Sequence, residues 1–150
     1  MHLLNIFLNR VLISALIAWG LAQIIKLPLD YILTKRWNWA LLISVGGMPS
    51  SHSALVTATA LGTGLWSGFD SPVFALAVAV SMVVIYDATG IRRQAGIHAQ
   101  TINMLVEELF KGHPASEKQL REVLGHTPME AAGGVLLGLV IPILLWLVWK

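Results

Sequence analysis

The chain has 150 residues, of which 56% are hydrophobic and 12% are charged, and its formal net charge is +2. A soluble domain usually carries about a quarter charged residues, so this composition indicates a membrane protein. The small net charge does not indicate a nucleic-acid partner. The absence of cysteine excludes disulfides, a thiol nucleophile and a thiolate metal site. No basic region precedes the first apolar run, so we do not expect a cleaved signal peptide.

Four apolar blocks predict four membrane helices, because the chain has too little polar sequence to cover them in water. A hydrocarbon core about 30 Å thick is crossed by about 20 apolar residues in a helix. The last block reaches this length comfortably, whereas the middle two are shorter. We expect helices over residues 4–25, 49–66, 72–88 and 129–149. The prediction is an all-α polytopic membrane helix bundle with one or two interfacial helices, forming a single domain over residues 1–150.

Two polar segments connect these helices. Residues 26–50 contain Lys26, Lys35 and Arg36 beside large aromatic rings, which is typical of a membrane–water boundary. Residues 89–128 contain further lysines and arginines. With four helices, both segments fall on the same side of the bilayer, and basic residues favour the cytoplasm. We therefore expect a multi-pass protein of the cell membrane with both segments cytoplasmic and both termini on the other side.

A further helix is expected inside the second polar segment. Its apolar residues recur at helical spacing, so they form one face. Such a helix would lie in the membrane interface or pack under the bundle. A short helix is expected at 116–124. The residues on the predicted apolar face are Ile91, Ala95, His98, Ile102, Leu105 and Leu109.

The first polar cluster is the sequence Gly-Gly-Met-Pro-Ser-Ser-His at 46–52, at the start of the second helix. Gly46 and Gly47 allow the backbone to turn its N–H groups toward an anion, and the helix N-terminus adds positive potential. Ser50 and Ser51 can donate hydrogen bonds to phosphate. A glycine-rich turn with serine caps explains the same residues equally well.

The second cluster, residues 86–98, follows the third helix. The adjacent Arg92 and Arg93 can hold several oxygens of a phosphate in fixed geometry. Asp87 lies near the membrane boundary, where an unpaired carboxylate is costly, so we expect it to pair with an arginine. The alternative is that the two arginines only reflect the preference of basic residues for cytoplasmic segments, and that the ion pair is structural.

The third cluster is the sequence Leu-Gly-His-Thr-Pro-Met-Glu at 124–130, at the start of the fourth helix. One helical turn separates His126 from Glu130, so the carboxylate can orient or charge-stabilise the imidazole. Alternatively, Thr127 caps the helix and Glu130 is a favourable first-turn acid. A divalent cation between Asp87 and Glu130 is a weaker idea, and we otherwise expect no metal and no cofactor.

All three clusters lie at helix ends on the same side of the predicted bundle. Together they supply hydroxyl donors, arginines, histidines and carboxylates. These are the groups needed for phosphoryl transfer from a phosphate ester held in a membrane.

The three motifs together resemble the divergent branch of the type 2 phosphatidic acid phosphatase family, which is related to acid phosphatases and vanadium haloperoxidases. The resemblance covers nearly the whole chain. It implies that Ser50 binds phosphate and that His52 protonates the leaving oxygen, although Ser51 stands where the main family has glycine. Arg92, Gly96 and His98 keep the spacing of the main family's arginine, glycine and nucleophilic histidine.

Two departures from the main family bear on the site. The aspartate expected four residues after the nucleophile is replaced by Ile102. The basic first motif is also incomplete, because Leu33 stands where an arginine should follow Lys26, and Lys26 remains a phosphate-binding candidate. Three alternatives remain for the nucleophile: His126, with Glu130 as its orienting group, His98, or neither of the two.

Two functions follow as hypotheses. The first is a metal-independent lipid-phosphate phosphatase that forms a phosphohistidine on phosphatidic acid, phosphatidylglycerophosphate or a polyprenyl phosphate. The second is a non-catalytic lipid- or anion-binding membrane protein, or a transporter, that keeps the phosphate cradle. Gly134 and Gly138 form a small-residue face in the last helix, which serves either packing within the chain or a homodimer.

Overall fold

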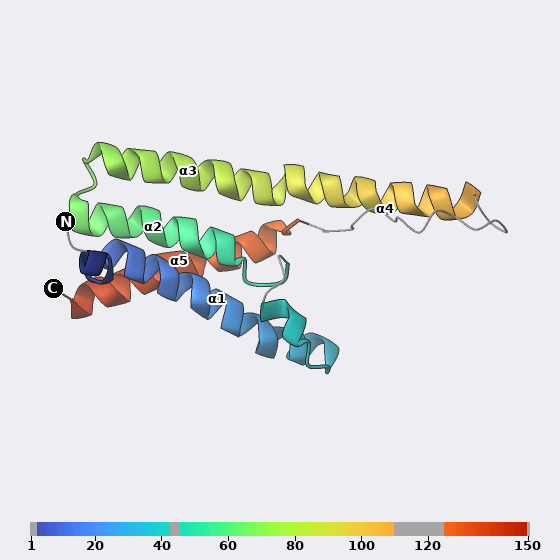
Figure 1. Ribbon diagram of the computed structural model, residues 1–150, viewed down its shortest axis with the longest axis horizontal. Coiled ribbons are helices and arrows are strands. Elements are labelled where there is room, and N and C mark those ends of the chain that lie inside the picture. The colour runs from blue at the N-terminus through green and yellow to red at the C-terminus, as the bar shows by residue number, and fades with distance from the viewer. Residues whose placement is uncertain (1–2, 43–45, 110–124, 150) are drawn as a thin grey trace.

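A computed structural model describes residues 3–42, 46–109 and 125–149 of the chain. The described residues form an all-α membrane helix bundle, as predicted (Figure 1). Among the described residues, three helical runs, not the four predicted, are long and apolar enough to cross a membrane: Arg10–Thr34, Pro72–Leu109 and Pro128–Val148. In chain order the elements are the 3-10 helix η1 (Leu3–Leu8), α1 (Arg10–Thr34), the 3-10 helix η2 (Trp39–Leu42), α2 (Ser51–Ser67), α3 (Pro72–Thr89), α4 (Ile91–Leu109) and α5 (Pro128–Val148).

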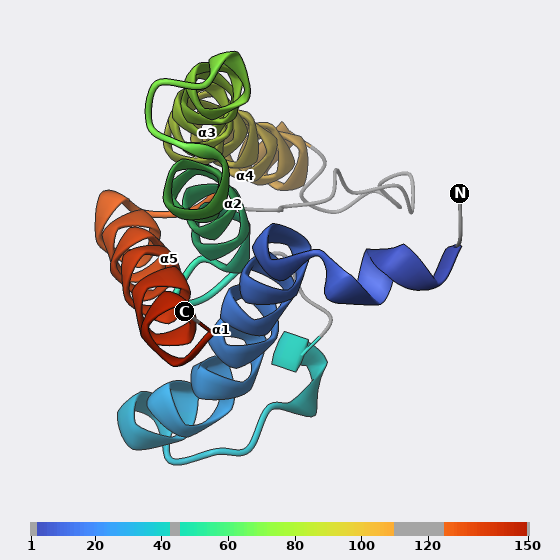
Figure 2. The same ribbon diagram turned by 90° about the vertical axis from the view of Figure 1, so that its left-hand side faces the viewer.

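The shortest helix of the bundle, α2, lies at its centre. It has 17 residues and contacts α1, α3 and α5, and the view along the bundle places it between these three helices (Figure 2). Nine of its residues are buried, and all of them are alanine, glycine, serine or threonine. Small side chains of this kind let helix backbones approach closely, which is how helices associate in lipid.

The α2–α5 interface is the closest of these contacts. A Cβ atom added to Gly134 would collide with the carbonyl oxygen of Ser50, and one added to Gly138 would lie 2.7 Å from the carbonyl oxygen of Ala54. The two glycines therefore let α5 rest directly on the α2 backbone. Within the described residues this small-residue face is used inside the chain, and the homodimer stays a prediction.

Alanine side chains pack α1 against α2. Ala15, Ala18 and Ala22 on α1 form one core cluster with Ala54 and Ala58 on α2. All five are essentially inaccessible to solvent. The core of the bundle therefore consists mainly of small side chains between closely spaced backbones, together with Ile141 of the last helix, and many of the large apolar side chains are exposed.

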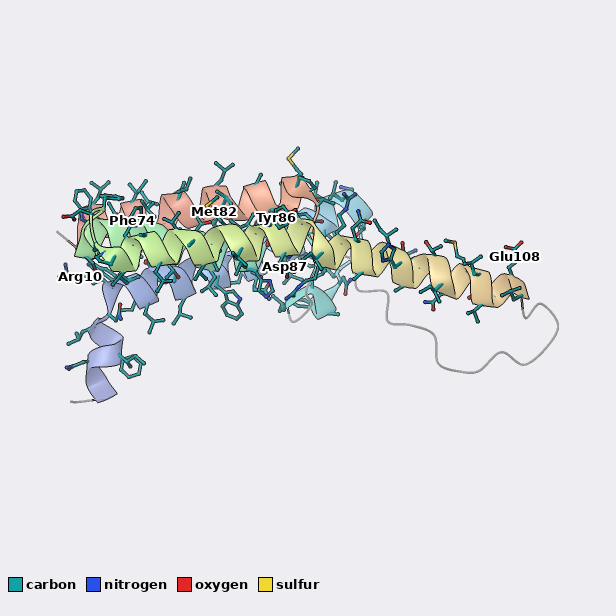
Figure 3. The ribbon with its side chains drawn as sticks, turned by 90° about the horizontal axis from the view of Figure 1, so that it is seen from above. Arg10, Phe74, Met82, Tyr86, Asp87 and Glu108 are labelled. Atoms are coloured by element: carbon teal, nitrogen blue, oxygen red, sulfur yellow. The ribbon has the colours of Figure 1, made fainter. Side chains whose placement is uncertain are left out.

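The helices alternate in direction, so the end of α1, the start of α2, the end of α3 and the start of α5 lie at the same end of the bundle (Figure 1). Both chain termini lie at the opposite end. Figure 3 shows Arg10 at the terminal end and Asp87 toward the other. The predicted convergence of the three motif-bearing helix ends is therefore present.

The first helix is longer than predicted. It runs to Thr34 and ends where Lys35 adopts a left-handed conformation, with its N–H donating to the carbonyl oxygen of Tyr31. Lys26 and Asp30, which we placed in a connecting segment, are inside this helix. The prediction stopped early because charged residues beside large aromatic rings, beginning at Lys26, are typical of a membrane boundary.

The predicted amphipathic helix is present as α4, but it does not pack under the bundle. Among the described helices, α4 contacts only α3, whose direction it continues (Figure 1). Glu108 lies at its far tip, beyond the bundle (Figure 3). The predicted apolar face is exposed, with Ile91 65% and Leu109 79% accessible. The short helix expected at 116–124 lies outside the described residues.

Candidate active site

The segment that carries His126 is held against the junction of α3 and α4. The His126 N–H donates to the carbonyl oxygen of Ala88 over 3.0 Å. A Cβ atom on Gly125 would lie 2.8 Å from that same oxygen and would also collide with the backbone N of Arg93. Glycine at this position therefore allows the segment to pack against the α3–α4 junction. This contact fixes the backbone position of His126.

The His126 ring is oriented by Glu130. Its Nδ1 lies 3.1 Å from Glu130 Oε2, and the same oxygen accepts a hydrogen bond from the Thr127 N–H over 3.0 Å. Thr127 Oγ1 in turn accepts from the Glu130 N–H, which completes a capping box at the start of α5. Orientation of the imidazole and helix capping, which the sequence offered as alternatives, are therefore both present in this one arrangement.

The hydrogen bond to Glu130 determines which nitrogen of His126 is free to react. A carboxylate only accepts hydrogen bonds, so in the neutral imidazole Nδ1 carries the proton and Nε2 keeps its lone pair. His126 is 3% accessible, and Nε2 has no hydrogen-bond partner among the described residues. The arrangement therefore places a buried imidazole nitrogen without a partner inside the protein.

His52 lies beside His126, in the first turn of α2. The two ring centroids are 6.3 Å apart and their planes are tilted by 54°. Lys26 and Arg92 are close enough to interact electrostatically with His52. Both imidazoles can therefore contact the same small anion, with positive charge from two further helices nearby.

Lys26 is the most buried cationic side chain of the described residues. It is 1% accessible, and its Nζ has no hydrogen-bond partner among those residues. Gly47, with φ of 84°, passes over the lysine stem, and its Cβ position lies 3.8 Å from Lys26 Cδ. Lys26 also interacts electrostatically with Glu130. Its amine therefore ends beneath the glycine loop, on the same side as the two histidines.

The serines of the first cluster are deeply buried. Ser50 is the N-cap of α2, where its Oγ accepts from the Ser53 N–H over 3.3 Å and lies 3.0 Å from Ser53 Oγ. The Ser50 N–H donates to the carbonyl oxygen of Glu130 over 2.8 Å. Ser51 is 2% accessible. Ser50 therefore caps α2 and links the first cluster to the third through its backbone. Gly46, earlier in the same cluster, is only half-buried.

The predicted partner of Asp87 is confirmed. Arg92 Nε lies 3.1 Å from Asp87 Oδ2, and the two side chains are 56% and 37% accessible. Arg93 is exposed. The pair therefore lies at the mouth of the site, where a guanidinium can reach both the carboxylate and an incoming anion.

His98, the other candidate nucleophile, is separated from this cluster. It is exposed on α4, two turns after Ile91, and α3 is the only described helix that α4 contacts. The structure thus brings together His52, His126, Glu130 and Lys26, with Arg92 nearby, and leaves His98 outside.

A metal centre has little support in this geometry. Within residues 3–42, 46–109 and 125–149, no group of three or more histidine, aspartate or glutamate side chains could hold an ion. Asp87 is paired with Arg92, and Glu130 is bonded to His126 and to the Thr127 N–H. The two carboxylates considered for a cation are therefore each engaged within the protein.

The depth of Lys26 is the feature that the sequence prediction missed. A signal was present, because Ala18, Ala22 and Lys26 follow one another in steps of four along α1. The first two are in the core, so a helix continued by one more turn places Lys26 on the same buried face. The early predicted end of the helix concealed this.

Comparisons with known proteins agree with the motifs. Residues 7–141 match the family described as the divergent PAP2 family. The chain is 39% identical over 153 residues to the uncharacterized membrane protein YuiD of Bacillus subtilis strain 168, covering 95% of this chain and 97% of that protein. No solved structure matches the chain. The family match spans most of the chain and includes all three motifs, and this membrane protein therefore belongs to the divergent PAP2 family.

Proposed function

We propose that this protein is a membrane phosphatase that hydrolyses a phosphomonoester or pyrophosphate lipid through a phosphohistidine. The observation that carries the proposal is the His126–Glu130 pair. It leaves the buried Nε2 of His126 without a partner, beside a second histidine and a buried lysine. A free imidazole nitrogen among cationic groups suits attack on phosphorus, and a positioned second imidazole suits proton transfer.

In the first step, His126 Nε2 attacks the phosphorus atom and the P–O bond to the lipid alcohol breaks. His52, in its protonated form, gives its proton to the departing oxygen. Glu130 accepts the Nδ1–H hydrogen bond and stabilises the positive charge that develops on His126 as the N–P bond forms. The products are a phosphohistidine and the free lipid alcohol, so charge and protons balance.

The second step releases phosphate. His52, now neutral, takes a proton from water, whose oxygen attacks the phosphorus atom. The N–P bond breaks, its electron pair returns to His126 Nε2, and inorganic phosphate leaves. The same side chain thus acts first as acid and then as base, as microscopic reversibility requires.

Lys26 and Arg92 neutralise the phosphoryl oxygens during both steps. Lys26 approaches from the interior, below the loop that contains Gly46 and Gly47, and Arg92 approaches from the exposed mouth. Backbone N–H groups of that loop and the N-terminus of α2 add further positive potential. Ser50 and Ser51 shape this loop and reach phosphate only if the cap rearranges. Arg93 supplies positive charge at the mouth.

The position of the site supports a lipid substrate. It lies at one end of a bundle whose outer surface is apolar, so a lipid can stay in the bilayer while its phosphate reaches the histidines. Phosphatidic acid, phosphatidylglycerophosphate and polyprenyl phosphates all have this shape. We further propose that this end faces the cytoplasm, because basic residues of short segments favour that side.

The decisive assay measures phosphate release by purified protein in mixed micelles containing each of these lipids. Replacing His126 or His52 with alanine should lower turnover at least about a hundredfold, the usual contribution of such groups. The matched control is His98→Ala, which should keep most of the activity. Loss of turnover in His98→Ala with retention in His126→Ala would reverse the assignment. No turnover of any lipid phosphate by the wild-type protein would refute the phosphatase proposal.

One observation favours the second function, a non-catalytic anion- or lipid-binding protein. The Ser50 hydroxyl is fully buried and acts as a helix cap, so one phosphate contact expected of an active enzyme is occupied. Tight binding of inorganic phosphate without turnover of any lipid phosphate, and loss of that binding in Lys26→Met, would support this alternative.

Sidedness can be tested directly because the chain has no cysteine. A single cysteine is placed at Arg36, at the site end, or at Asp70, in the turn between α2 and α3 at the other end. A membrane-impermeant maleimide applied to intact cells should label Asp70→Cys and spare Arg36→Cys. The opposite pattern would place the site outside the cytoplasm.

A further inference from the structure

The packing between α2 and α3 differs from the rest of the bundle. Here α2 presents larger side chains, and a groove with a volume of about 360 Å³ lies between the helices. It is lined by residues of α2 between Leu55 and Thr63 and by residues of α3 between Val73 and Ser81. Only Ser81 and Ala88 of α3 are buried, so this helix stands off from the bundle. The groove therefore opens to the hydrocarbon region.

The hydroxyl groups in this groove are not free to bind a polar ligand. Thr59 Oγ1 donates to the carbonyl oxygen of Leu55 over 2.8 Å, and Thr63 Oγ1 donates to that of Thr59 over 2.7 Å. Ser81 Oγ lies within hydrogen-bond distance of carbonyl oxygens on both helices, at 2.8 Å from Val56 and 2.7 Å from Ala77. With these groups satisfied by the backbone, the groove offers an apolar surface.

The groove leads toward the candidate active site. Leu55 is three residues, or one helical turn, after His52 on α2. On α3, Ser81 precedes Asp87 by six residues, which is about 9 Å along a helix. A lipid whose phosphate lies at His52 and His126 would therefore have its hydrocarbon part at the level of the groove.

The dimensions of the groove favour one kind of occupant. Leu55 to Thr63 spans about 12 Å along the helix, so the volume corresponds to a mean cross-section of about 30 Å². A helix with its side chains is about 10 Å across, with a cross-section of about 80 Å². The groove is too narrow to enclose a helix of a second copy of the chain, whereas a single extended hydrocarbon chain fits.

We propose that the α2–α3 groove holds the first part of one hydrocarbon chain of the lipid substrate and makes the enzyme selective for long-chain lipid phosphates. This inference rests on the proposed function for the identity of the substrate. The groove contacts about 12 Å of chain, most of the roughly 15 Å thickness of one leaflet. Each buried methylene adds favourable transfer free energy, so chains that fill the groove bind better.

The first experiment measures binding and does not require turnover. Wild-type protein is placed in vesicles that contain a phosphatidic acid with a photoreactive group near the middle of one acyl chain. After illumination, the labelled residues are mapped by mass spectrometry. Labelling should concentrate on α2 between Leu55 and Thr63 and on the facing part of α3, and excess inorganic vanadate should reduce it. Labelling spread evenly over the outer surface, or confined to α1 and α5, would overturn the proposal.

The second experiment changes the groove. Ala77→Phe places a ring in it, and Val83→Phe is the matched control, because Val83 is 69% accessible on the same helix and does not line the groove. Ala77→Phe should lower the long-chain to short-chain ratio of phosphate release about tenfold, as expected from displacing two or so methylenes. Val83→Phe should leave the ratio unchanged. An unchanged ratio in a folded, active Ala77→Phe protein would refute the proposal that the groove binds the hydrocarbon chain.

The two proposals fail in different ways. If wild-type protein releases no phosphate but acyl labelling still maps to the groove, lipid binding there stands and the phosphatase function falls. If phosphate is released but acyl labelling lies outside the groove and Ala77→Phe does not change the chain-length preference, the phosphatase function stands and the groove assignment falls. Should Ala77→Phe fail to fold, the labelling map on the wild-type protein still decides the question.

Discussion

The two sides of α2 show how one short helix serves two purposes. On its α5 side, Gly134 and Gly138 bring two backbones into direct contact. On its α3 side, larger residues hold the helices apart and leave a groove of about 360 Å³. The close side keeps His52, Ser50 and Glu130 in a fixed relation, whereas the open side faces lipid. Rigid support for chemistry and access for a substrate are thus separated across one helix.

The largest expected effect comes from disrupting the close contact between α2 and α5. Gly134→Ala adds a Cβ atom that collides with the Ser50 carbonyl oxygen and lies 2.9 Å from Ser53 Cβ. Overpacking of this kind costs about 1–3 kcal/mol and occasionally more, and the obstacle here is backbone. We expect thermal unfolding in detergent at a clearly lower temperature, together with loss of turnover.

Gly20→Ala is the control for that substitution. Its Cβ atom would have no neighbour within 4 Å, so only helix propensity changes, which favours alanine by about 1 kcal/mol. The melting temperature should stay the same or rise. Equal melting temperatures for Gly134→Ala and Gly20→Ala would contradict the close packing of α2 on α5.

Lys26→Met tests the role of the buried lysine of α1 beside the candidate site. A buried polar group without a partner costs about 1–3 kcal/mol, so the substitution should raise the stability of the protein without ligand. The same change removes a cation from the phosphate site, so binding of vanadate should weaken and turnover should fall at least about tenfold. Calorimetry and a thermal shift assay measure these opposite effects.

Lys35→Met provides a matched control, because Lys35 is an exposed lysine at the end of the same helix. It should alter neither stability nor vanadate binding appreciably. A Lys26→Met protein that is destabilised and still binds vanadate normally would show that the buried lysine has a structural role only.

A smaller effect on stability is expected from a substitution between α2 and α3. Ser81 Oγ reaches the Val56 carbonyl oxygen across the helix pair at 2.8 Å. Ser81→Ala removes this contact, and interhelical hydrogen bonds in membranes contribute about 0.6 kcal/mol on average. We expect a shift in the unfolding free energy below about 1 kcal/mol. A loss comparable to that of Gly134→Ala would mean that the α3 side is as tightly held as the α5 side.

The smallest effect on stability should come from Asp87→Asn. The Asp87–Arg92 pair is exposed at the mouth of the site, and exposed pairs contribute about 0–1 kcal/mol. The melting temperature should change little, and any change should vanish at high salt. A large, salt-insensitive loss of stability would instead make this pair part of the rigid frame.

The membrane class, the helix order and the convergence of three motifs at one end could be predicted from the sequence. Apolar block length determines the helices, and alternation of direction determines which ends meet. The Asp87–Arg92 pair also followed from the cost of an unpaired carboxylate near the membrane. These predictions rest on local composition, which a single sequence displays directly.

Two other features depend on packing that local patterns do not display. Lys26 was placed in a connecting segment because basic residues beside aromatic rings indicate a membrane boundary, yet the helix continues through Lys26 to Thr34. The choice between His98 and His126 could not be made from spacing, since each has a suitable sequence around it. Only the docking of Gly125 on the end of α3 and the protrusion of α4 separate these two histidines in space.

Trapping the covalent intermediate tests the central claim most directly. Protein is mixed with a lipid phosphate carrying radiolabelled phosphate, quenched in alkali to preserve phosphohistidine, and digested for mapping. We expect label on His126, no label in His126→Ala, and persistent label in His98→Ala. Label on His98, or turnover without any labelled histidine, would contradict the assignment of His126 as nucleophile.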